Sequence, residues 1–208
     1  MNDIKETFEL WYKQLFKREF IWDDLSTKIY YTLLLYFLQE ERFYKSPFIT
    51  QQSKPDLNKG LLIVGDYGIG KSSIFKALHV TLSRSNNLKL NYYTTNEVVN
   101  NYKECVKSSH EILKGFWDRH NKLPAVYDDL FNERPVVDYG ERIDVMGTVL
   151  FNRAEINAKT FCIMNYQTEN KSLSEALKAV SGRYGLRVYD RFFQMFNILE
   201  INGQSKRV

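Results

Sequence analysis

One eight-residue segment constrains the fold of this chain more than any other feature of the sequence. Residues 65–72 read Gly-Asp-Tyr-Gly-Ile-Gly-Lys-Ser, a glycine and four residues followed by Gly-Lys-Ser. The apolar run 61–64 before it is typical of a buried strand, and residues 71–83 after it have a helical pattern. Glycines between a strand and a helix let backbone N–H groups turn toward a phosphate without a side chain in the way. The segment therefore predicts a nucleotide-binding α/β domain.

The residue types in this segment indicate how a nucleoside triphosphate and Mg²⁺ would be held. Lys71 supplies a cation for the β- and γ-phosphates, and the Ser72 hydroxyl is a ligand for Mg²⁺. The helix that starts near Lys71 directs its positive end at the same anion. The whole loop is expected to contact the nucleotide: Gly65, Asp66, Tyr67, Gly68, Ile69, Gly70, Lys71, Ser72 and Ser73.

Polar residues follow two later strand-like segments. Asp128 and Asp129 come directly after 125–127, and Asn165 comes after 161–164. Ligands bind at the carboxyl ends of strands in open α/β sheets. We expect Asp128 to hold Mg²⁺ through its water shell, Asp129 to polarise the attacking water, and Asn165 to contact the γ-phosphate or that water. The alternatives are a helix cap for the two acids and a simple turn for the asparagine.

The rest of residues 60–208 alternates between strand-like and helix-like segments. Strands separated by helical stretches form a parallel sheet with helices on both faces. We therefore predict a three-layer α/β sandwich around a five-stranded parallel sheet, with a break in the last helical stretch at 182–185. The expected strands are 61–64, 88–93, 125–127, 160–164 and 198–201, and the expected helices are 71–83, 96–119, 142–156 and 172–196.

The first 59 residues hold 13 of the 31 aromatic residues. Apolar side chains recur at three- and four-residue steps in 4–16, and a second helical pattern covers 25–43. These helices are expected to pack either on the nucleotide-binding domain or on a partner. We predict a small helical N-terminal region at 1–45, a polar connector at 46–59 and the nucleotide-binding domain at 60–208.

The composition excludes several other classes of protein. Two cysteines cannot form a disulfide framework, and three scattered histidines lack the spacing of a zinc site. The longest apolar run, 29–38, is about half as long as a membrane-spanning helix. The N-terminus lacks the basic and apolar regions of a signal peptide. We expect a cytoplasmic protein without a membrane partner.

Positive charge is concentrated near the C-terminus. The chain has 29 basic and 25 acidic side chains, a net charge of +4, and residues 171–208 hold seven basic against three acidic ones. So small a surplus does not by itself indicate a nucleic-acid partner. Arg183, Arg187 and Arg191 are four residues apart, so one continuous helix would place them on the same face. Part of the surplus is then expected to face the nucleotide of a neighbouring subunit.

Several short motifs occur in a fixed order along residues 57–208. An Asp-Asp pair ends one strand, an arginine lies near the end of the next helix, and an asparagine ends the following strand. A helix with Arg-x-x-Asp-Arg and a last strand followed by Gly-x-Ser-x-Arg complete the series. The residues concerned are Asp128-Asp129, Asn152-Arg153, Met164-Asn165, 185–192 and Gly203-Gln204-Ser205-Lys206-Arg207, with a Tyr139-Gly140 pair between the first two motifs.

These motifs and their order resemble those of the AAA+ ATPases of the DnaC helicase-loader and IstB transposition-helper group. The resemblance implies an AAA+ domain at 60–208 that binds ATP and Mg²⁺. Because the chain ends soon after the last strand, no C-terminal helical lid is expected, and a neighbouring subunit would complete the site. The implied roles are Lys71 and Ser72 as nucleotide and Mg²⁺ contacts, Asp128 as the metal residue, Asp129 as the catalytic acid, Asn165 as the sensor of the terminal phosphate, and Arg191 as the arginine finger, with Arg187, Arg183 and Arg153 as rivals.

The same resemblance implies a replication ATPase whose hydrolysis is slow until DNA or a partner stimulates it. Its implied partners are a replicative helicase, single-stranded DNA and further copies of the chain that assemble with ATP. A transposition helper acting with a transposase uses the same residues and is the first alternative. A nucleoside or small-molecule kinase and a nucleotide-gated binding module are two others that share the phosphate-binding loop.

Overall fold

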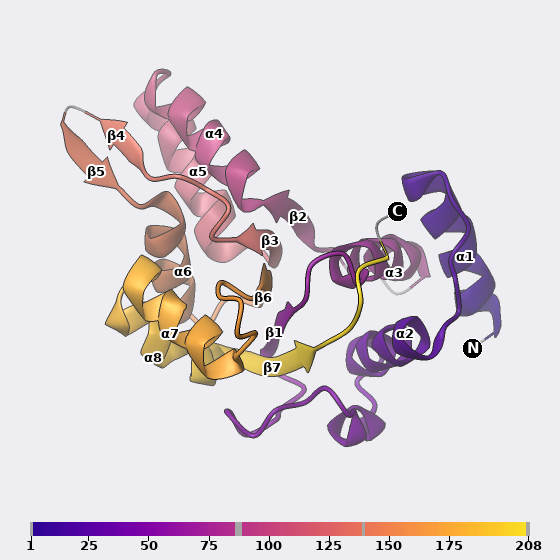
Figure 1. Cartoon of the computed structure of the whole chain (residues 1–208). Coiled ribbons are helices and arrows are strands. Elements are labelled where there is room, and N and C mark those ends of the chain that lie inside the picture. Colours follow the sequence, from indigo (N-terminus) through magenta and orange to yellow (C-terminus); the bar gives the residue numbers. More distant parts are fainter. Residues whose placement is uncertain (1, 86–88, 139, 207–208) are drawn as a thin grey trace.

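A computed structural model of the chain describes residues 2–85, 89–138 and 140–206. Its centre is a five-stranded sheet whose neighbouring strands all run parallel, in the order β2-β3-β6-β1-β7 (Figure 1). Helices pack on both faces of this sheet, which confirms the predicted three-layer α/β sandwich. The strands are β1 (Gly60–Gly65), β2 (Asn91–Thr94), β3 (Ala125–Leu130), β6 (Thr160–Asn165) and β7 (Phe196–Ile201).

The apolar runs of the strands explain why both faces of the sheet are covered. Every residue of β1 is buried. Leu61 and Ile63 belong to one core and Leu62 and Val64 to the other, because successive side chains of a strand point to opposite faces. A parallel strand that is buried on both faces therefore needs an unbroken apolar run rather than an alternating one.

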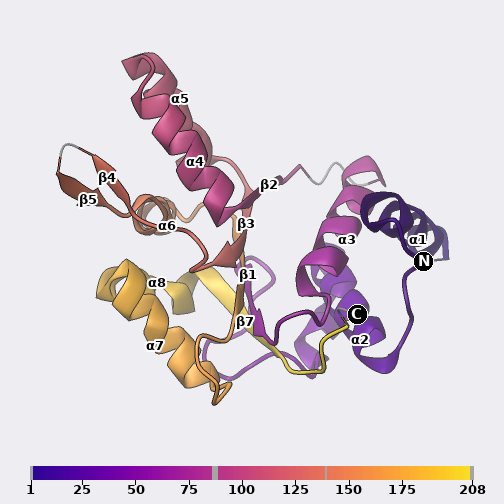
Figure 2. The same ribbon diagram turned by 45° about the horizontal axis from the view of Figure 1, so that its top comes forward.

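One core lies between the sheet and the N-terminal helices. Phe8 of α1 and Tyr30 of α2 have ring centroids 4.7 Å apart and share this core with Phe75 of α3. Figure 2 shows the three helices together on this side of the sheet. Of the two expected locations for the N-terminal helices, the structure shows packing on the same chain. The elements of this layer are α1 (Asn2–Phe16), α2 (Asp24–Phe37), the short 3₁₀ helix η1 (Glu41–Lys45) and α3 (Lys71–Ser85).

The second core lies on the opposite face and is the larger of the two. Val98, Phe116, Val149, Leu177 and Phe192 bring five helices against the sheet there. A small hairpin projects beside these helices (Figure 1). The elements are α4 (Thr95–Val106), α5 (His110–Lys122), α6 (Val145–Glu155), α7 (Leu173–Tyr184), α8 (Leu186–Met195) and the hairpin strands β4 (Val136–Asp138) and β5 (Glu141–Ile143).

Residues 46–59 run along the edge strand β7. Ile49 forms an isolated bridge with Leu199. The backbone N–H of Thr50 donates to the carbonyl of Ile198 at 3.0 Å. An edge strand has unpaired backbone groups that promote association with other chains. The predicted connector therefore also covers an edge of the sheet, while the domain boundaries at 45/46 and 59/60 stay a prediction.

Three predicted helices end or begin in different places. The helix predicted at 96–119 is interrupted after Val106, and the Ser109 side chain then accepts the Ile112 N–H at 3.3 Å as the N-cap of α5. The helix predicted from residue 142 begins at Val145, because 141–143 pair in the hairpin. The helix predicted at 25–43 ends at Phe37, and η1 follows.

The predicted strand at 88–93 is observed at 91–94. Three residues of the predicted strands and motifs, Leu88, Tyr139 and Arg207, lie outside the described residues.

The break predicted at 182–185 is confirmed and has a consequence for the arginines. Gly185 has φ +93° and separates α7 from α8. Arg183 ends up on α7, whereas Arg187 and Arg191 lie on α8. The condition for a shared face, one continuous helix, is therefore not met. Within the described ranges, no helix combines the length and apolar character needed to cross a membrane.

Candidate nucleotide site

The loop between β1 and α3 has a geometry that depends on its glycines. A Cβ atom on Gly65 would lie 1.9 Å from the carbonyl oxygen of Ile201 in β7, so only glycine fits there. Gly68 and Gly70 have φ values of +74° and +100°, where L-residues are strained. Because α3 begins at Lys71, its first N–H groups have no partner within the helix and face the mouth of the loop. The loop can therefore present donors to an anion.

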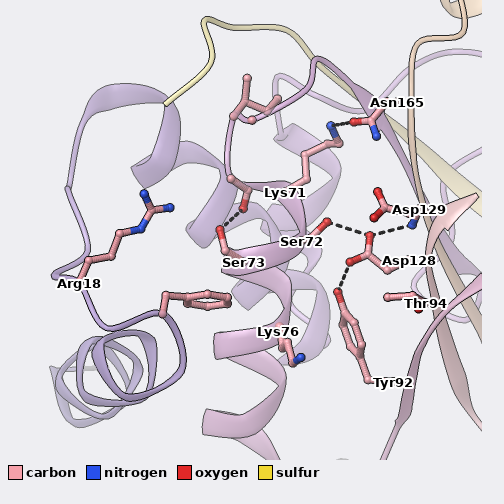
Figure 3. A pocket seen from close by; sticks show the side chains of 14 residues that line it. Arg18, Lys71, Ser72, Ser73, Lys76, Tyr92, Thr94, Asp128, Asp129 and Asn165 are labelled. Atoms are coloured by element: carbon pink, nitrogen blue, oxygen red, sulfur yellow. Dashed lines mark hydrogen bonds between the residues drawn. The ribbon is translucent and has the colours of Figure 1, made fainter. Parts of the chain in front are cut away.

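Lys71 connects this loop to the end of β6. Its side chain is buried, and its ammonium donates to the carbonyls of Gly65 at 3.0 Å and Asp66 at 2.5 Å. It also donates to Oδ1 of Asn165 at 2.9 Å (Figure 3). Lys71 and Asn165, the two residues predicted to contact the terminal phosphate, are thus in direct contact with each other.

Ser72 and Asp128 meet beside it. The Ser72 hydroxyl donates to Oδ1 of Asp128 at 2.8 Å, and the Tyr92 hydroxyl donates to Oδ2 at 2.7 Å (Figure 3). Burial raises the pKa of the Asp128 carboxyl, although the bonds from Tyr92 and Ser72 favour its ionised form. Among the described residues, no group of three His, Cys, Asp or Glu side chains gathers as a metal site. A Mg²⁺ ion here would instead need phosphate oxygens and water, which is its usual preference.

Asp129 occupies an irregular part of β3. The ladder between β3 and β6 is interrupted after Tyr127 and resumes at Leu130, and Asp129 itself has φ +58°. With Asn165, Asp129 lines the pocket of about 300 Å³ that contains Lys71 and Ser72, and also an adjoining cavity of about 220 Å³. The predicted catalytic acid and sensor therefore face the same space. The two acids belong to the strand itself rather than to a helix cap.

The side chains of Asp66 and Tyr67 do not line the pocket that contains Lys71 and Ser72, while the contact of these loop residues with the nucleotide stays a prediction. The Asp66 carboxylate accepts from Lys171 at 2.8 Å and from the Gly203 N–H at 3.0 Å. Burial opposes its ionisation, but these bonds outweigh it and lower the pKa of Asp66. The side chain of Asp66 is thus an anchor for the loop. Tyr67 is exposed and lines the adjoining cavity rather than the pocket that contains Lys71 and Ser72.

The pocket also contains residues that sequence reasoning missed. Tyr92 lies within β2 and Thr94 ends it, and the rule that ligands meet strand ends could have found Thr94. Phe16 and Arg18 come from the end of α1 and the loop that follows it. Their presence depends on how α1 packs on α3, for which no local motif exists. Lys76, one turn into α3 after Ser72, completes this side of the pocket (Figure 3).

Arg153 cannot reach a neighbouring subunit, contrary to expectation. Its side chain is 0% exposed. The guanidinium donates to the carbonyls of His120 at 2.6 Å, Leu123 at 2.9 Å and Lys159 at 2.7 Å, and to the Thr160 hydroxyl at 2.9 Å. It joins the end of α5 to the start of β6 and is a structural residue.

The other candidate arginines differ in how they are held. Arg183 is bound to Glu133 at 3.1 Å and forms an ion pair with Asp144, so it also faces its own chain. Arg191 is half exposed and pairs with Glu155 at 3.1 Å. Arg187 is exposed on a groove of about 520 Å³ between α6 and the α7–α8 break. Only Arg187 and Arg191 of the four are placed to reach another molecule.

The strand order, the loop between β1 and α3, and the facing serine and aspartate define a P-loop α/β fold. Solved structures with this fold include a DnaC helicase loader (TM-score 0.61, 19% identity, 88% of this chain and 93% of that one). A structure of DnaI has a TM-score of 0.53 and 20% identity, over 82% of this chain and 85% of that one. AMPPCP-bound DnaA from Aquifex aeolicus has a TM-score of 0.51 and 16% identity, over 88% of this chain and 48% of that one. No protein-family model matches the sequence, and no curated protein does. The similarity of this chain to these solved structures is therefore a similarity of fold.

Proposed function

We propose that this chain binds and hydrolyses ATP and acts in DNA replication in the manner of a helicase loader. The observation that carries the proposal is the convergence of Lys71, Ser72, Asp128 and Asn165 on one pocket. The fold shared with a DnaC helicase loader and with DnaA bound to an ATP analogue supports the same assignment.

The residues of the pocket fit a triphosphate with Mg²⁺. The Lys71 ammonium lies at the loop mouth, held by oxygen acceptors that phosphate oxygens can replace. Ser72 and Asp128 present a hydroxyl and a carboxylate oxygen 2.8 Å apart, which suits one ion that keeps several waters. Bound Mg²⁺ would neutralise phosphate charge. Ser73 extends the loop toward Arg18 and Lys76, so the nucleotide can lie along the first turn of α3.

Hydrolysis needs a group that orients water and a cation for the charge that develops on the phosphate. We assign the first role to Asp129, whose carboxylate can accept a hydrogen bond from water in the space that it shares with Asn165. We assign the second to Arg191 of a neighbouring copy, with Arg187 as its rival, because both are accessible on α8. Turnover then requires an ATP-dependent homo-oligomer.

Single-stranded DNA and a replicative helicase are the partners that we propose. The likeness to a helicase loader supports the helicase. Because a neighbouring copy completes the proposed site, we expect hydrolysis to be slow until DNA or a partner brings the copies together.

Binding of a fluorescent ATP analogue in the presence of Mg²⁺ tests the nucleotide site. Lys71→Ala should weaken binding by about tenfold or more, because a charge-assisted contact to phosphate is lost. Lys178→Ala removes an exposed lysine of α7 outside the pocket and should bind as the wild type does. Equal binding by the wild type and Lys71→Ala would contradict the proposal.

A further inference from the structure

The segment that carries Asp129 is poorly fixed by the sheet. Neither Asp128 nor Asp129 pairs with β6, because the register of the ladder shifts between Tyr127 and Leu130. Asp129 and Phe131 both have positive φ values, +58° and +78°, which L-residues rarely adopt. Strained backbone of this kind persists only where surrounding contacts hold it. The direction of the Asp129 carboxylate therefore depends on contacts from outside the strand.

Two side chains make such contacts with the backbone. The Thr95 hydroxyl, at the start of α4, donates to the Asp129 carbonyl at 2.8 Å. On the other side of the strained segment, the Phe131 N–H donates to the Tyr184 hydroxyl at 3.1 Å. The rings of Phe131 and Tyr184 also lie 5.4 Å apart. Tyr184 thus holds Phe131 by both its ring and its hydroxyl.

Tyr184 is itself fixed in a buried polar network. Its hydroxyl donates to Oε1 of Glu133 at 2.7 Å, and Arg183 donates to the same oxygen at 3.1 Å. Arg183 also pairs with Asp144, the N-cap of α6. Tyr184 and Glu133 are both buried, and accepting from Phe131 while donating to Glu133 gives the phenol a defined orientation. A phenylalanine at 184 would fill the same space but release the Phe131 N–H.

We propose that Tyr184 is a positioning residue for hydrolysis, which acts by holding the Phe131 backbone and so the direction of the Asp129 carboxylate. The inference rests on the proposed ATPase function. It assigns a role to the last residue of α7, directly before the break at Gly185. Because α8 and its accessible arginines begin after this break, Tyr184 and the Phe131 backbone connect α8 to the segment that carries the catalytic acid.

The test compares Tyr184→Phe with Tyr36→Phe in the full chain. Tyr36 is the matched control, since its buried hydroxyl donates to the Lys59 carbonyl at 2.6 Å at the opposite end of β1. Tyr184→Phe should lower kcat for ATP about tenfold and leave KM within about twofold, because it misplaces the acid and not the phosphate loop. Without nucleotide, the Phe131 amide should exchange its hydrogen about tenfold faster in Tyr184→Phe than in Tyr36→Phe.

Each outcome of this comparison decides one claim. Slower turnover with an unchanged KM and faster exchange at Phe131 supports the role of Tyr184. If Tyr184→Phe hydrolyses ATP as fast as Tyr36→Phe, or if its Phe131 amide exchanges no faster, the inference is overturned while the proposed function stands. Absence of hydrolysis in the wild type with DNA would overturn the proposed function and this inference with it.

Discussion

At the scale of single residues, Arg153 carries a positive charge into the core and satisfies backbone carbonyls from α5 and from the segment before β6. A buried acceptor that loses its donor costs more free energy than the bond itself contributes. Arg153→Leu should therefore lower the free energy of unfolding by about 3 kcal/mol or more. Arg187→Leu, at an exposed position of α8, should change it by less than about 0.5 kcal/mol. Urea unfolding measures both, and equal stability of the two variants would refute the structural role.

Comparison of Arg153 with Lys71 and Ser72 shows which positions a local motif could predict and which it could not. The local motif placed Lys71 and Ser72 at the start of a helix directly after a strand and a glycine loop, where the structure has them. Arg153 also fitted a motif, but its role depends on carbonyls up to 33 residues away. Arg183 likewise depends on Glu133 and Asp144. Such distant partners leave no signal in the sequence around the arginine.

At the scale of elements, the end of α5 gives the fold a pH dependence. His120 is fully buried, and burial, followed by the charges of Arg119 and Arg153, lowers its pKa to about 4. The unfolded chain has the ordinary pKa of about 6.5 and binds this proton first. The stability that His120 contributes is therefore complete above pH 6.5 and is lost as the pH falls toward 4.

His120→Phe should remove this dependence. Between pH 7 and pH 5, the free energy of unfolding of the wild type should fall by about 2 kcal/mol more than that of His120→Phe. His110→Phe, at an exposed position of the same helix, should follow the wild type. Urea titrations at the two pH values measure the difference, and parallel losses in all three proteins would contradict the assignment.

The differences between predicted and observed elements have a common physical cause. Periodicity predicted the five strands and most of the helices, because burial on one or both faces leaves a pattern in the sequence. It did not find the hairpin of β4 and β5, which lies outside the main sheet. It also missed the interruption before α5, since Ser109 acts as an N-cap only once the preceding chain has turned.

At the scale of the whole molecule, the N-terminal helices form part of the core rather than an appendage. α1 and α2 cover α3 and one face of the sheet, and they bury Phe8, Tyr30 and Leu33 there. A chain that starts at residue 60 would expose this face to water. We expect it to lose cooperative thermal unfolding and to bind the dye ANS, unlike the full chain. A sharp transition in the shortened chain would contradict this account of the core.

The positive charge near the C-terminus is in large part paired within the chain, while its predicted role at a neighbouring nucleotide site stays a prediction. Lys171, Arg183, Arg191 and Lys206 all form ion pairs within the chain, with Asp66, Glu133 and Asp144, Glu155, and Asp23. Lys171 and Lys206 hold the phosphate loop, since Lys206 also donates its N–H to the Gly68 carbonyl at 3.0 Å. Lys171, Arg183 and Lys206 are therefore engaged within the chain, and Arg187 and the half-exposed Arg191 stay the candidates for a neighbouring site.

The rate of ATP hydrolysis with and without single-stranded DNA tests the central claim most directly. The account predicts Mg²⁺-dependent hydrolysis that DNA stimulates in the wild type and in Lys178→Ala. Asp129→Asn should abolish it, because the group that polarises water is lost, and Arg191→Ala should lose the stimulation. Phosphate transfer that appears only with a nucleoside acceptor, or hydrolysis that ignores DNA and survives both substitutions, would contradict it.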